Sequence, residues 1–250
     1  MVYRYLYSLI PFRSRQFVKN SKIGLYIIAL TRLPLILIPP ASYSQFNEDI
    51  IAKKYTPEKY GFYLDIGSGD PVRGSNTFSL YKKGWRGILI DPLPKNIFLN
   101  KLIRRKDKSI QGFVGKTKSE ITFYELDPYE YSTAVEPRAL ELIKNKDAKL
   151  VQITLQSSVV ISELDLNFDQ NNPSLLSIDC EGYDFEILKT IEFKKYKFRI
   201  VIIEDFELKV HSSKIYKLLI KNNYQFIERT GPSSIYVLKS YLAKNKFYKD

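Results

Sequence analysis

The sequence predicts an α/β fold, in which helices cover both faces of a mostly parallel sheet and an antiparallel hairpin closes one edge. Short apolar runs, typical of buried strands, alternate along the chain with segments whose apolar residues recur at helical spacing. A glycine-rich turn follows the first of these strands, and Asp91 ends the second. Parallel sheets are buried on both faces, which explains why the predicted strands are continuously apolar.

Each predicted element follows from a local pattern. Phe62, Tyr63, Leu64 and Ile66 form a short apolar run that Gly67 ends, as expected for a buried strand. The strands predicted in this way span residues 62–66, 88–90, 110–114, 121–126, 150–155, 175–178, 200–203, 224–227 and 235–238. Helical spacing predicts helices at residues 46–55, 76–83, 95–104, 137–144, 183–190 and 213–221. Gly231 and Pro232 join the last two strands into the edge hairpin.

Residues 1–40 differ in composition from the rest and are predicted to form an N-terminal extension. An aromatic and basic start is followed by an almost wholly apolar run over residues 23–38, which Arg32 and Pro34 interrupt. A spanning helix needs about 20 predominantly apolar residues, so this run is a poor transmembrane candidate. The run begins late and no small-residue cleavage pattern follows it closely, which disfavours a cleaved signal peptide.

Two interpretations of this extension stay open. It is either a helix packed on the main domain or a segment lying in a membrane interface, where basic side chains face anionic headgroups. The basic residues concerned are Arg4, Arg13, Arg15, Lys19 and Lys22. Pro39 and Pro40 mark the boundary, because neither continues a helix. We therefore expect an extension over 1–40, one α/β domain over 41–240 and a basic tail over 241–250.

Composition and charge limit the class of protein. The chain has 250 residues and 44% of them are hydrophobic, which is typical of a folded domain. Cys180 is the only cysteine, so the chain has no intrachain disulfide and no zinc-ligand cluster, which favours a cytoplasmic location. The net charge of +12 is compatible with nucleic acid, anionic lipid or a phosphate-bearing substrate. The lysines are scattered, so a solvated basic surface is the simplest explanation and nucleic acid is disfavoured.

The turn after the first strand predicts a cofactor site. It has the sequence Asp65-Ile66-Gly67-Ser68-Gly69-Asp70, and glycines there let the backbone turn sharply and let a ligand approach closely. A dinucleotide fingerprint needs a third glycine where Val72 stands, which disfavours hydride-transfer cofactors. Asp65 would crowd a pyrophosphate, but it suits a ligand that carries an ammonium and a sulfonium.

Asp91 strengthens this prediction. It lies 22 residues beyond Gly69, where Rossmann-like sheets place an acid that accepts hydrogen bonds from ribose hydroxyls. Asp65 and Asp91 together predict S-adenosylmethionine as cofactor. In the alternative interpretation Asp65 only caps the turn and Asp91 is a surface acid before Pro92. The residues predicted to bind the cofactor are Asp65, Gly67, Ser68, Gly69, Asn76, Asp91 and Asp179.

The strand over 175–178 leads into an acidic turn, Asp179-Cys180-Glu181-Gly182, which is the predicted catalytic site. In an open α/β sheet this turn faces the same crevice as the glycine turn. Methyl transfer is an in-line displacement, so the protein must align the acceptor oxygen and remove its proton. We predict that Glu181 faces the acceptor and that Asp179 lines the cofactor or shapes the turn. A purely structural turn is the alternative.

Other candidates are weaker. His211 is the sole histidine and is a third candidate base, although a lone histidine is usually a surface or packed residue. Glu204 and Asp205 end the next strand and with Asp179 offer oxygen ligands for a hard divalent ion. Carboxylates at strand ends are common, so we predict no metal. Cys180 lies among acids that disfavour a thiolate, and we expect it to pack in the core.

Residues 129–133 (YEYST) follow a predicted strand and carry aromatic rings and hydroxyls that suit a sugar ring. This segment is interpreted either as part of an acceptor-binding loop or as a plain solvated loop.

Six strings in this chain resemble, in order, the motifs of the FkbM-type methyltransferase family. They are residues 44–49 (SQFNED), 61–67 (GFYLDIG), 75–77 (SNT), 84–87 (GWRG), 91–94 (DPLP) and 179–182 (DCEG). The resemblance covers about residues 43–238. It implies a Rossmann-like class I methyltransferase fold, S-adenosylmethionine as methyl donor, and O-methylation of sugars, glycans or polyketide-type metabolites.

The chain departs from this family pattern at three positions. Gly69 stands where the family often has asparagine and Pro71 where it often has glycine, which leaves the shape of the cofactor loop open. Asp91 replaces a more usual glutamate and shortens the reach of the carboxylate by one methylene.

The function predicted from the sequence is therefore O-methylation of a hydroxyl on a sugar, glycan or related small acceptor. The basic charge suggests a nucleic-acid methyltransferase as an alternative, but amine-methylating enzymes need an Asn/Asp-Pro-Pro-aromatic turn where this chain has Asp179-Cys180-Glu181-Gly182. A second alternative is a non-catalytic S-adenosylmethionine-binding module held at a membrane by residues 1–40. We expect a cytoplasmic protein, with peripheral membrane contact as an open possibility.

Overall fold

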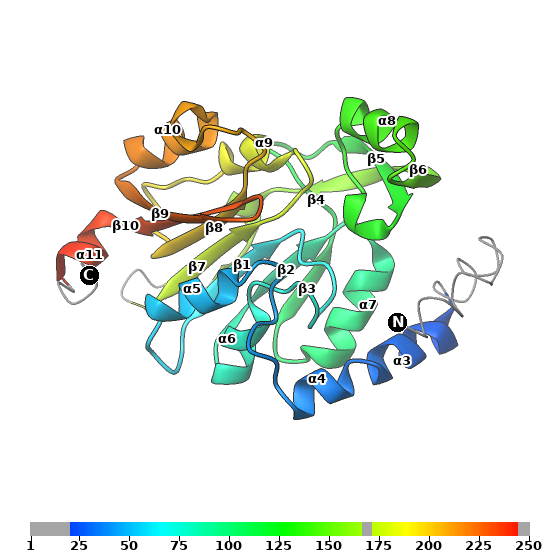
Figure 1. The fold of residues 1–250 in the computed structure, drawn as a ribbon, viewed down its shortest axis with the longest axis horizontal. Coiled ribbons are helices and arrows are strands. Elements are labelled where there is room, and N and C mark those ends of the chain that lie inside the picture. The colour runs from blue at the N-terminus through cyan, green and yellow to red at the C-terminus, as the bar shows by residue number, and fades with distance from the viewer. Residues whose placement is uncertain (1–20, 167–171, 245–250) are drawn as a thin grey trace.

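The computed structural model describes residues 21–166 and 172–244, and a seven-stranded sheet runs through the middle of this part of the chain (Figure 1). The strand order is β3-β2-β1-β7-β8-β10-β9. In that order the strands span Lys108–Gln111, Arg86–Asp91, Phe62–Ile66, Ser174–Ile178, Ile200–Glu204, Ser233–Leu238 and Tyr224–Thr230. The first five are parallel, and β10 runs antiparallel to both β8 and β9. The predicted α/β fold with an antiparallel edge hairpin is confirmed.

The position of β1 determines where a ligand can bind. Strand β1 lies between β2 and β7. After β1 the chain adds β2 and β3 on one side of it, and later adds β7 and β8 on the other side. Asp65 is in register with Leu89 of β2 and with Ser177 of β7. Open α/β sheets bind ligands at such a switch point, outside the carboxyl ends of the strands.

Helices cover both faces of this sheet. Figure 1 shows α5, α6 and α7 on one face and α9 and α10 on the other. Their bounds are Glu48–Lys54, Phe78–Lys83, Pro94–Ile103, Asp184–Leu188 and Lys214–Lys221. Strand β1 serves both layers: Leu64 and Ile66 pack with residues of α9 and α10, whereas Tyr63 packs with residues of α5 and α6. Alternate side chains of a strand point to opposite faces, so two separate cores form.

A three-stranded sheet lies beside the main one, in the order β4-β6-β5. Its strands span Phe113–Val114, Lys149–Val159 and Glu120–Asp127, and they are accompanied by the short helix η1 (Tyr129–Tyr131) and by α8 (Glu136–Lys144). The sequence predicted one strand over 110–114, which is wrong. Gly112 adopts φ +152° and separates β3 from β4, and a Cβ there would lie 2.7 Å from Val159 Cγ2.

The described part of the extension forms two helices, α3 (Lys22–Leu30) and α4 (Leu33–Leu37). The Ser21 side chain caps α3 by accepting the N–H of Gly24, and Pro34 lies in the first turn of α4. Leu25 and Ala29 of α3 pack against Leu99 of α7. The extension is thus packed on the domain from residue 22 onward. Arg4, Arg13, Arg15 and Lys19 lie outside the described residues.

Two further findings concern the ends of the domain. The helix α11 (Lys239–Lys244) extends past the predicted domain end at residue 240, and Tyr241 and Leu242 pack against the core beneath α5 and α6. In the part of the chain that the structure describes, no helix combines the length and apolar character needed to cross a bilayer.

Candidate active site

A cavity of about 130 Å³ opens at the carboxyl ends of β1, β2 and β7. Three segments that follow strands of the main sheet line it: the loop after β1 (residues 67–74, the β1 loop), the segment 91–93 and the turn 179–181. The rings of Phe113, Phe123 and Tyr129 add an aromatic part from the small sheet and η1. The structure therefore brings together the two predicted halves of the site, the glycine turn and the acidic turn.

Gly67 lets the β1 loop pass close to the acidic turn. It adopts φ +75°, and a Cβ at this position would lie 1.8 Å from the backbone oxygen of Asp179. The N–H groups of Gly67 and Ser68 donate to the carbonyl of Ile90, at 2.9 and 3.2 Å, and the N–H of Asp179 donates to that of Ile66 at 3.0 Å. These bonds fix both turns to the ends of neighbouring strands.

Asp91 presents a rigid carboxylate to the cavity. Its Oδ2 accepts the N–H of Gly69 and its Oδ1 that of Leu93, each at 2.8 Å, and the amide of Asn96 donates to both oxygens at 3.1 Å. Burial raises the pKa of Asp91 to about 6, although these hydrogen bonds lower it. A carboxylate has about four acceptor positions, and these contacts occupy them, with the Asn96 amide shared between both oxygens. A ligand hydroxyl that binds Asp91 would therefore take the place of the shared amide.

Asp65 lies beneath the β1 loop and is not among the residues that line the cavity. Thr77 Oγ1 donates to its Oδ2 at 2.5 Å, and Arg104 Nη1 lies 3.9 Å from the same oxygen. Burial raises the pKa of Asp65, and the positive charge of Arg104 opposes that shift. Asn76 is also outside the lining and donates to Ser177 Oγ at 3.2 Å. The structure places both residues as supports of the loop, and their direct contact with a cofactor stays a prediction.

Arg104, at the end of α7, is a supporting residue that the sequence analysis missed. Its side chain is fully buried, and its guanidinium donates to Asp107 Oδ2 at 2.8 Å, Thr77 Oγ1 at 2.9 Å and Ser75 Oγ at 3.3 Å. It thereby connects α7 to the segment that holds Asp65. The sequence carries no signal that distinguishes Arg104 from Arg105, which is exposed.

Three carboxylates converge at the cavity, and we call Asp179, Glu181 and Glu204 the carboxylate cluster. Asp179 and Glu181 line the cavity and Glu204 does not. One oxygen from each lies within 4.8 Å of the other two. Desolvation, followed by the charges of neighbouring acids, raises the pKa of Asp179 well above its usual range and that of Glu204 to about 11. The pKa of Glu181 is raised to about 7, mainly by burial and against the effect of Arg138.

Local geometry fixes Glu181 at the cavity. Its backbone has φ +49°, a conformation that non-glycine residues rarely adopt. Thr133 Oγ1 donates to its carbonyl at 2.8 Å, and Arg138 Nη2 of α8 lies 3.8 Å from its Oε2. Asp184, which the sequence analysis also missed, accepts the N–H groups of Cys180 and Gly182 at 2.8 and 2.9 Å. A strained turn with so many anchors is typical of a functional site.

The other predicted residues have different surroundings. His211 is exposed and packs edge-on against Tyr216, with 4.7 Å between ring centroids, and the structure does not bring it to the cavity. Cys180 was expected in the core; it does pack against the main core, but it is only half-buried and also lines the cavity. Burial and the charge of Asp184 raise the pKa of its thiol well above the usual range, which disfavours a thiolate.

The extension contacts the β1 loop, which lines the cavity, through Arg32. Its Nε and Nη2 donate to Asp70 Oδ2 at 2.9 and 2.5 Å, and both side chains are largely buried. Asp70 Oδ1 in turn accepts the N–H groups of Val72 and Arg73 at 3.0 and 2.9 Å. The sequence did contain a signal for this pair, because Arg32 is the one charge inside an otherwise apolar run.

Comparison with known proteins identifies the family of this chain. The family model described as "Methyltransferase FkbM domain" matches residues 65–226, which is more than half of the chain. A solved structure, the TehB-like SAM-dependent methyltransferase from Corynebacterium glutamicum, is similar with 12% sequence identity and a TM-score of 0.43 over 88% of this chain and 100% of that one. No curated protein matches the chain significantly. The chain belongs to the FkbM methyltransferase family and is an S-adenosylmethionine-dependent methyltransferase.

Proposed function

We propose that this protein methylates a hydroxyl oxygen of a saccharide or a related small acceptor. The observation that carries the proposal is a shared cavity. The glycine turn and Asp91, which suit the methyl donor, line the same space as Glu181 and Tyr129, which suit a hydroxylated acceptor.

The residues around Asp91 fit the ribose of S-adenosylmethionine. The Asp91 carboxylate is held in place by backbone N–H groups, and a ribose hydroxyl would displace the shared Asn96 amide from its oxygens. A Cβ at Gly69 would have the carbonyl oxygen of Gly67 as its nearest neighbour, at 3.9 Å, so the backbone there is open to a ligand. When bound, S-adenosylmethionine supplies a methyl group whose bond to sulfur breaks, leaving the electron pair on sulfur, as the bond to the acceptor oxygen forms.

The remaining task of the protein is to hold the acceptor and receive its proton. Glu181 lines the cavity and its backbone is fixed by Thr133, which places its carboxylate where it can accept the hydroxyl proton. Arg138, 3.8 Å from the Glu181 carboxylate, offsets part of the negative charge of the cluster.

The lining also offers contacts for a saccharide. The Tyr129 ring, which Lys95 Nζ approaches to 4.7 Å from the ring centroid, lines the cavity, and Ser132 and Glu130 add polar groups from the same loop. The acceptor-loop interpretation of residues 129–133 thus supports the proposal. The acidic turn, in contrast, has no proline or aromatic residue that would clamp a flat base.

The test is transfer of a labelled methyl group. The purified chain is given labelled S-adenosylmethionine with nucleotide sugars, glycans or RNA, and we expect label in a saccharide hydroxyl. Glu181→Gln should lower kcat by about 100-fold or more, since loss of a general base typically has an effect of that size. Glu228→Gln, an exposed position on β9, is the matched control.

Two outcomes would contradict the proposal. Label in RNA alone would identify a nucleic-acid methyltransferase. Tight binding of S-adenosylmethionine with no transfer to any acceptor class would favour the non-catalytic module.

A further inference from the structure

We propose that the carboxylate cluster of Asp179, Glu181 and Glu204 binds a hard divalent cation, such as Mg²⁺ or Mn²⁺, which holds the acceptor hydroxyl. The inference rests on the proposed function, because it assigns the ion to the acceptor side of the same cavity. From the sequence we predicted no metal; the convergence of these three side chains is a property of the tertiary structure.

The spacing of the three oxygens suits one ion. They lie within 4.8 Å of one another and come from the ends of two adjacent strands, β7 and β8. Magnesium binds oxygen at about 2.1 Å, which places ligand oxygens about 3 to 4 Å apart. A small contraction of the cluster is therefore enough for all three oxygens to bind the same ion.

Glu204 provides independent evidence for a ligand. Its side chain is only 6% exposed, and its Oε2 is buried with no hydrogen-bond partner. A buried carboxylate without a partner is costly, so it requires either a proton or a cation. Within residues 21–166 and 172–244, the ion pair that reaches the cluster is that of Arg138 with Glu181, at 3.8 Å, and it does not involve Glu204.

A cation also resolves an electrostatic problem of the proposed reaction. Removal of a proton from the acceptor creates negative charge on oxygen, and any ionised carboxylate nearby opposes this. A divalent ion offsets two negative charges of the cluster and lowers the pKa of the oxygen that it binds. Each carboxylate has two oxygens, so Glu181 can ligate through one and receive the hydroxyl proton on the other.

The donor set indicates which ions are suitable. It consists of carboxylate oxygens, which hard cations prefer. His211, the only histidine, is not among the residues that line the cavity. Asp179 and Glu181 do line it, so an ion at the cluster has positions directed toward the acceptor.

Manganese binding to the full chain tests the site directly, without methyl donor or acceptor. Free Mn²⁺ is measured by electron paramagnetic resonance during a titration, and we expect one ion to bind per chain. Glu204→Gln keeps the shape of the side chain and should weaken binding by at least tenfold, whereas Glu228→Gln should not change it. Absence of binding at millimolar Mn²⁺, or equal binding by Glu204→Gln, would overturn the proposal and indicate a cluster neutralised by protons.

Thermal unfolding tests whether the Glu204→Gln variant is still folded. Mn²⁺ should raise the Tm of the wild type, because an ion that binds the folded state stabilises it. The Glu204→Gln protein should unfold cooperatively at a Tm that Mn²⁺ does not change. A rise in Tm equal to that of the wild type would contradict the assignment of Glu204.

The methyl-transfer assay separates this inference from the proposed function. Saccharide methylation at an undiminished rate in excess EDTA would overturn the role of the ion and leave the proposed function intact. In the opposite case, Mn²⁺ binding depends on Glu204 but the label appears in RNA alone. This result would confirm the ion site, overturn the proposed function, and exclude a role of the ion toward a saccharide hydroxyl.

Discussion

Asp91 is the side chain on which recognition of the methyl donor most depends. We expect Asp91→Asn to weaken binding of S-adenosylmethionine by about 10- to 100-fold, because a hydrogen bond to a charged group contributes about 1.5 to 3 kcal/mol. Isothermal titration calorimetry at neutral pH measures this. Unchanged affinity would show that the ribose binds elsewhere.

The same residue predicts a pH dependence. The pKa of Asp91 is raised to about 6, so its carboxyl gains a proton as the pH falls through 6 and loses acceptor capacity. The affinity of the wild type for S-adenosylmethionine should therefore decrease from pH 7 to pH 5. The Asp91→Asn variant lacks this titrating group. If its affinity for S-adenosylmethionine decreased from pH 7 to pH 5 as much as that of the wild type, Asp91 would not be the group responsible.

Gly67 and Gly74 form a natural pair for testing close packing in the β1 loop. Both adopt positive φ, +75° and +72°, but a Cβ at Gly67 would overlap the backbone of Asp179, whereas one at Gly74 would meet nothing within 4 Å. Gly74→Ala should lose about 1 to 2 kcal/mol of unfolding free energy from conformation alone. Gly67→Ala should lose clearly more in urea denaturation. Equal losses of unfolding free energy in the two variants would show that the β1 loop and the acidic turn can move apart at no energetic cost.

At the scale of elements, the contact between α4 and the β1 loop has one sequence signal, the single charge of Arg32 in an apolar run, and that signal does not identify its partner. Arg32 begins α4 as its N-cap residue and pairs with Asp70, which itself orders the next two N–H groups of the loop. We expect Arg32→Gln to cost about 3 kcal/mol or more, because it leaves a buried carboxylate without its partner. Hydrogen exchange should increase in residues 67–74, and affinity for the methyl donor should fall.

A matched control uses an exposed ion pair. Lys118 and Glu163 lie 2.8 Å apart with both side chains largely exposed. Lys118→Gln should change stability by less than about 0.5 kcal/mol, as is usual for surface pairs. If Arg32→Gln behaved like this control, the extension would have no role in ordering the loop.

Most elements could be predicted because each has a local cause. A continuous apolar run ended by glycine identified β1, and helical spacing identified α10, whose Ile215 and Leu219 are buried. The pairing of β4, β5 and β6 into a separate sheet had no such cause. Gly112 lies between β3 and β4, and Val159 of β6 is close enough that a Cβ there would overlap it, a contact that joins residues far apart in the chain.

At the scale of the whole molecule, the outer side of α3 and α4 is an apolar, exposed surface among the residues that the structure describes. Ile23, Leu30, Leu37 and Ile38 are strongly exposed there, and both figures show α3 at the surface. Residues 1–47 contain six lysines and arginines and no acidic residue. Peripheral contact of this region with an anionic membrane stays a prediction from the sequence, and this surface is where the contact would be made.

Vesicle flotation tests that prediction. The full chain should float with vesicles that contain anionic lipid, and Leu37→Asp should reduce the floating fraction severalfold, because a charge in the apolar face opposes insertion. Leu208→Asp is the control, since Leu208 is 92% exposed and lies outside this region. Equal flotation of the two variants would contradict the prediction.

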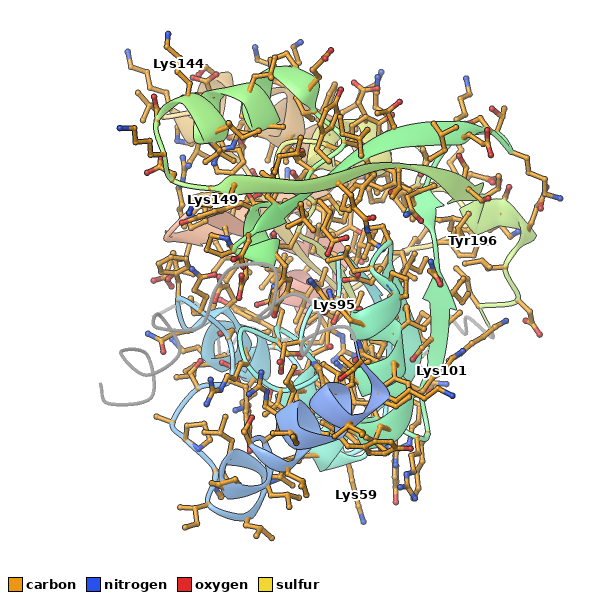
Figure 2. All side chains as sticks on the ribbon, turned by 90° about the vertical axis from the view of Figure 1, so that its right-hand side faces the viewer. Lys59, Lys95, Lys101, Lys144, Lys149 and Tyr196 are labelled. Atoms are coloured by element: carbon orange, nitrogen blue, oxygen red, sulfur yellow. The ribbon has the colours of Figure 1, made fainter. Side chains whose placement is uncertain are left out.

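Positive charge is not gathered on one site in the view of Figure 2. Figure 2 shows Lys95, Lys101, Lys144 and Lys149 spread over one view, from the α7 side to the small sheet and α8. This distribution is consistent with a solvated basic surface, and it gives no support to a nucleic-acid groove on this face.

The sequence by itself determined the α/β architecture, the glycine turn and the acids that follow three of the strands. Those features are local: a strand needs a run of apolar residues, a tight turn needs glycine, and the carboxyl ends of parallel strands share one edge. Only the tertiary structure decided what each acid contacts. Asp65 lies under the β1 loop with Arg104, Asp70 pairs with Arg32 from the extension, and Glu204 joins Asp179 and Glu181. These contacts join residues far apart in the chain, and their energies depend on burial, which a sequence pattern does not specify.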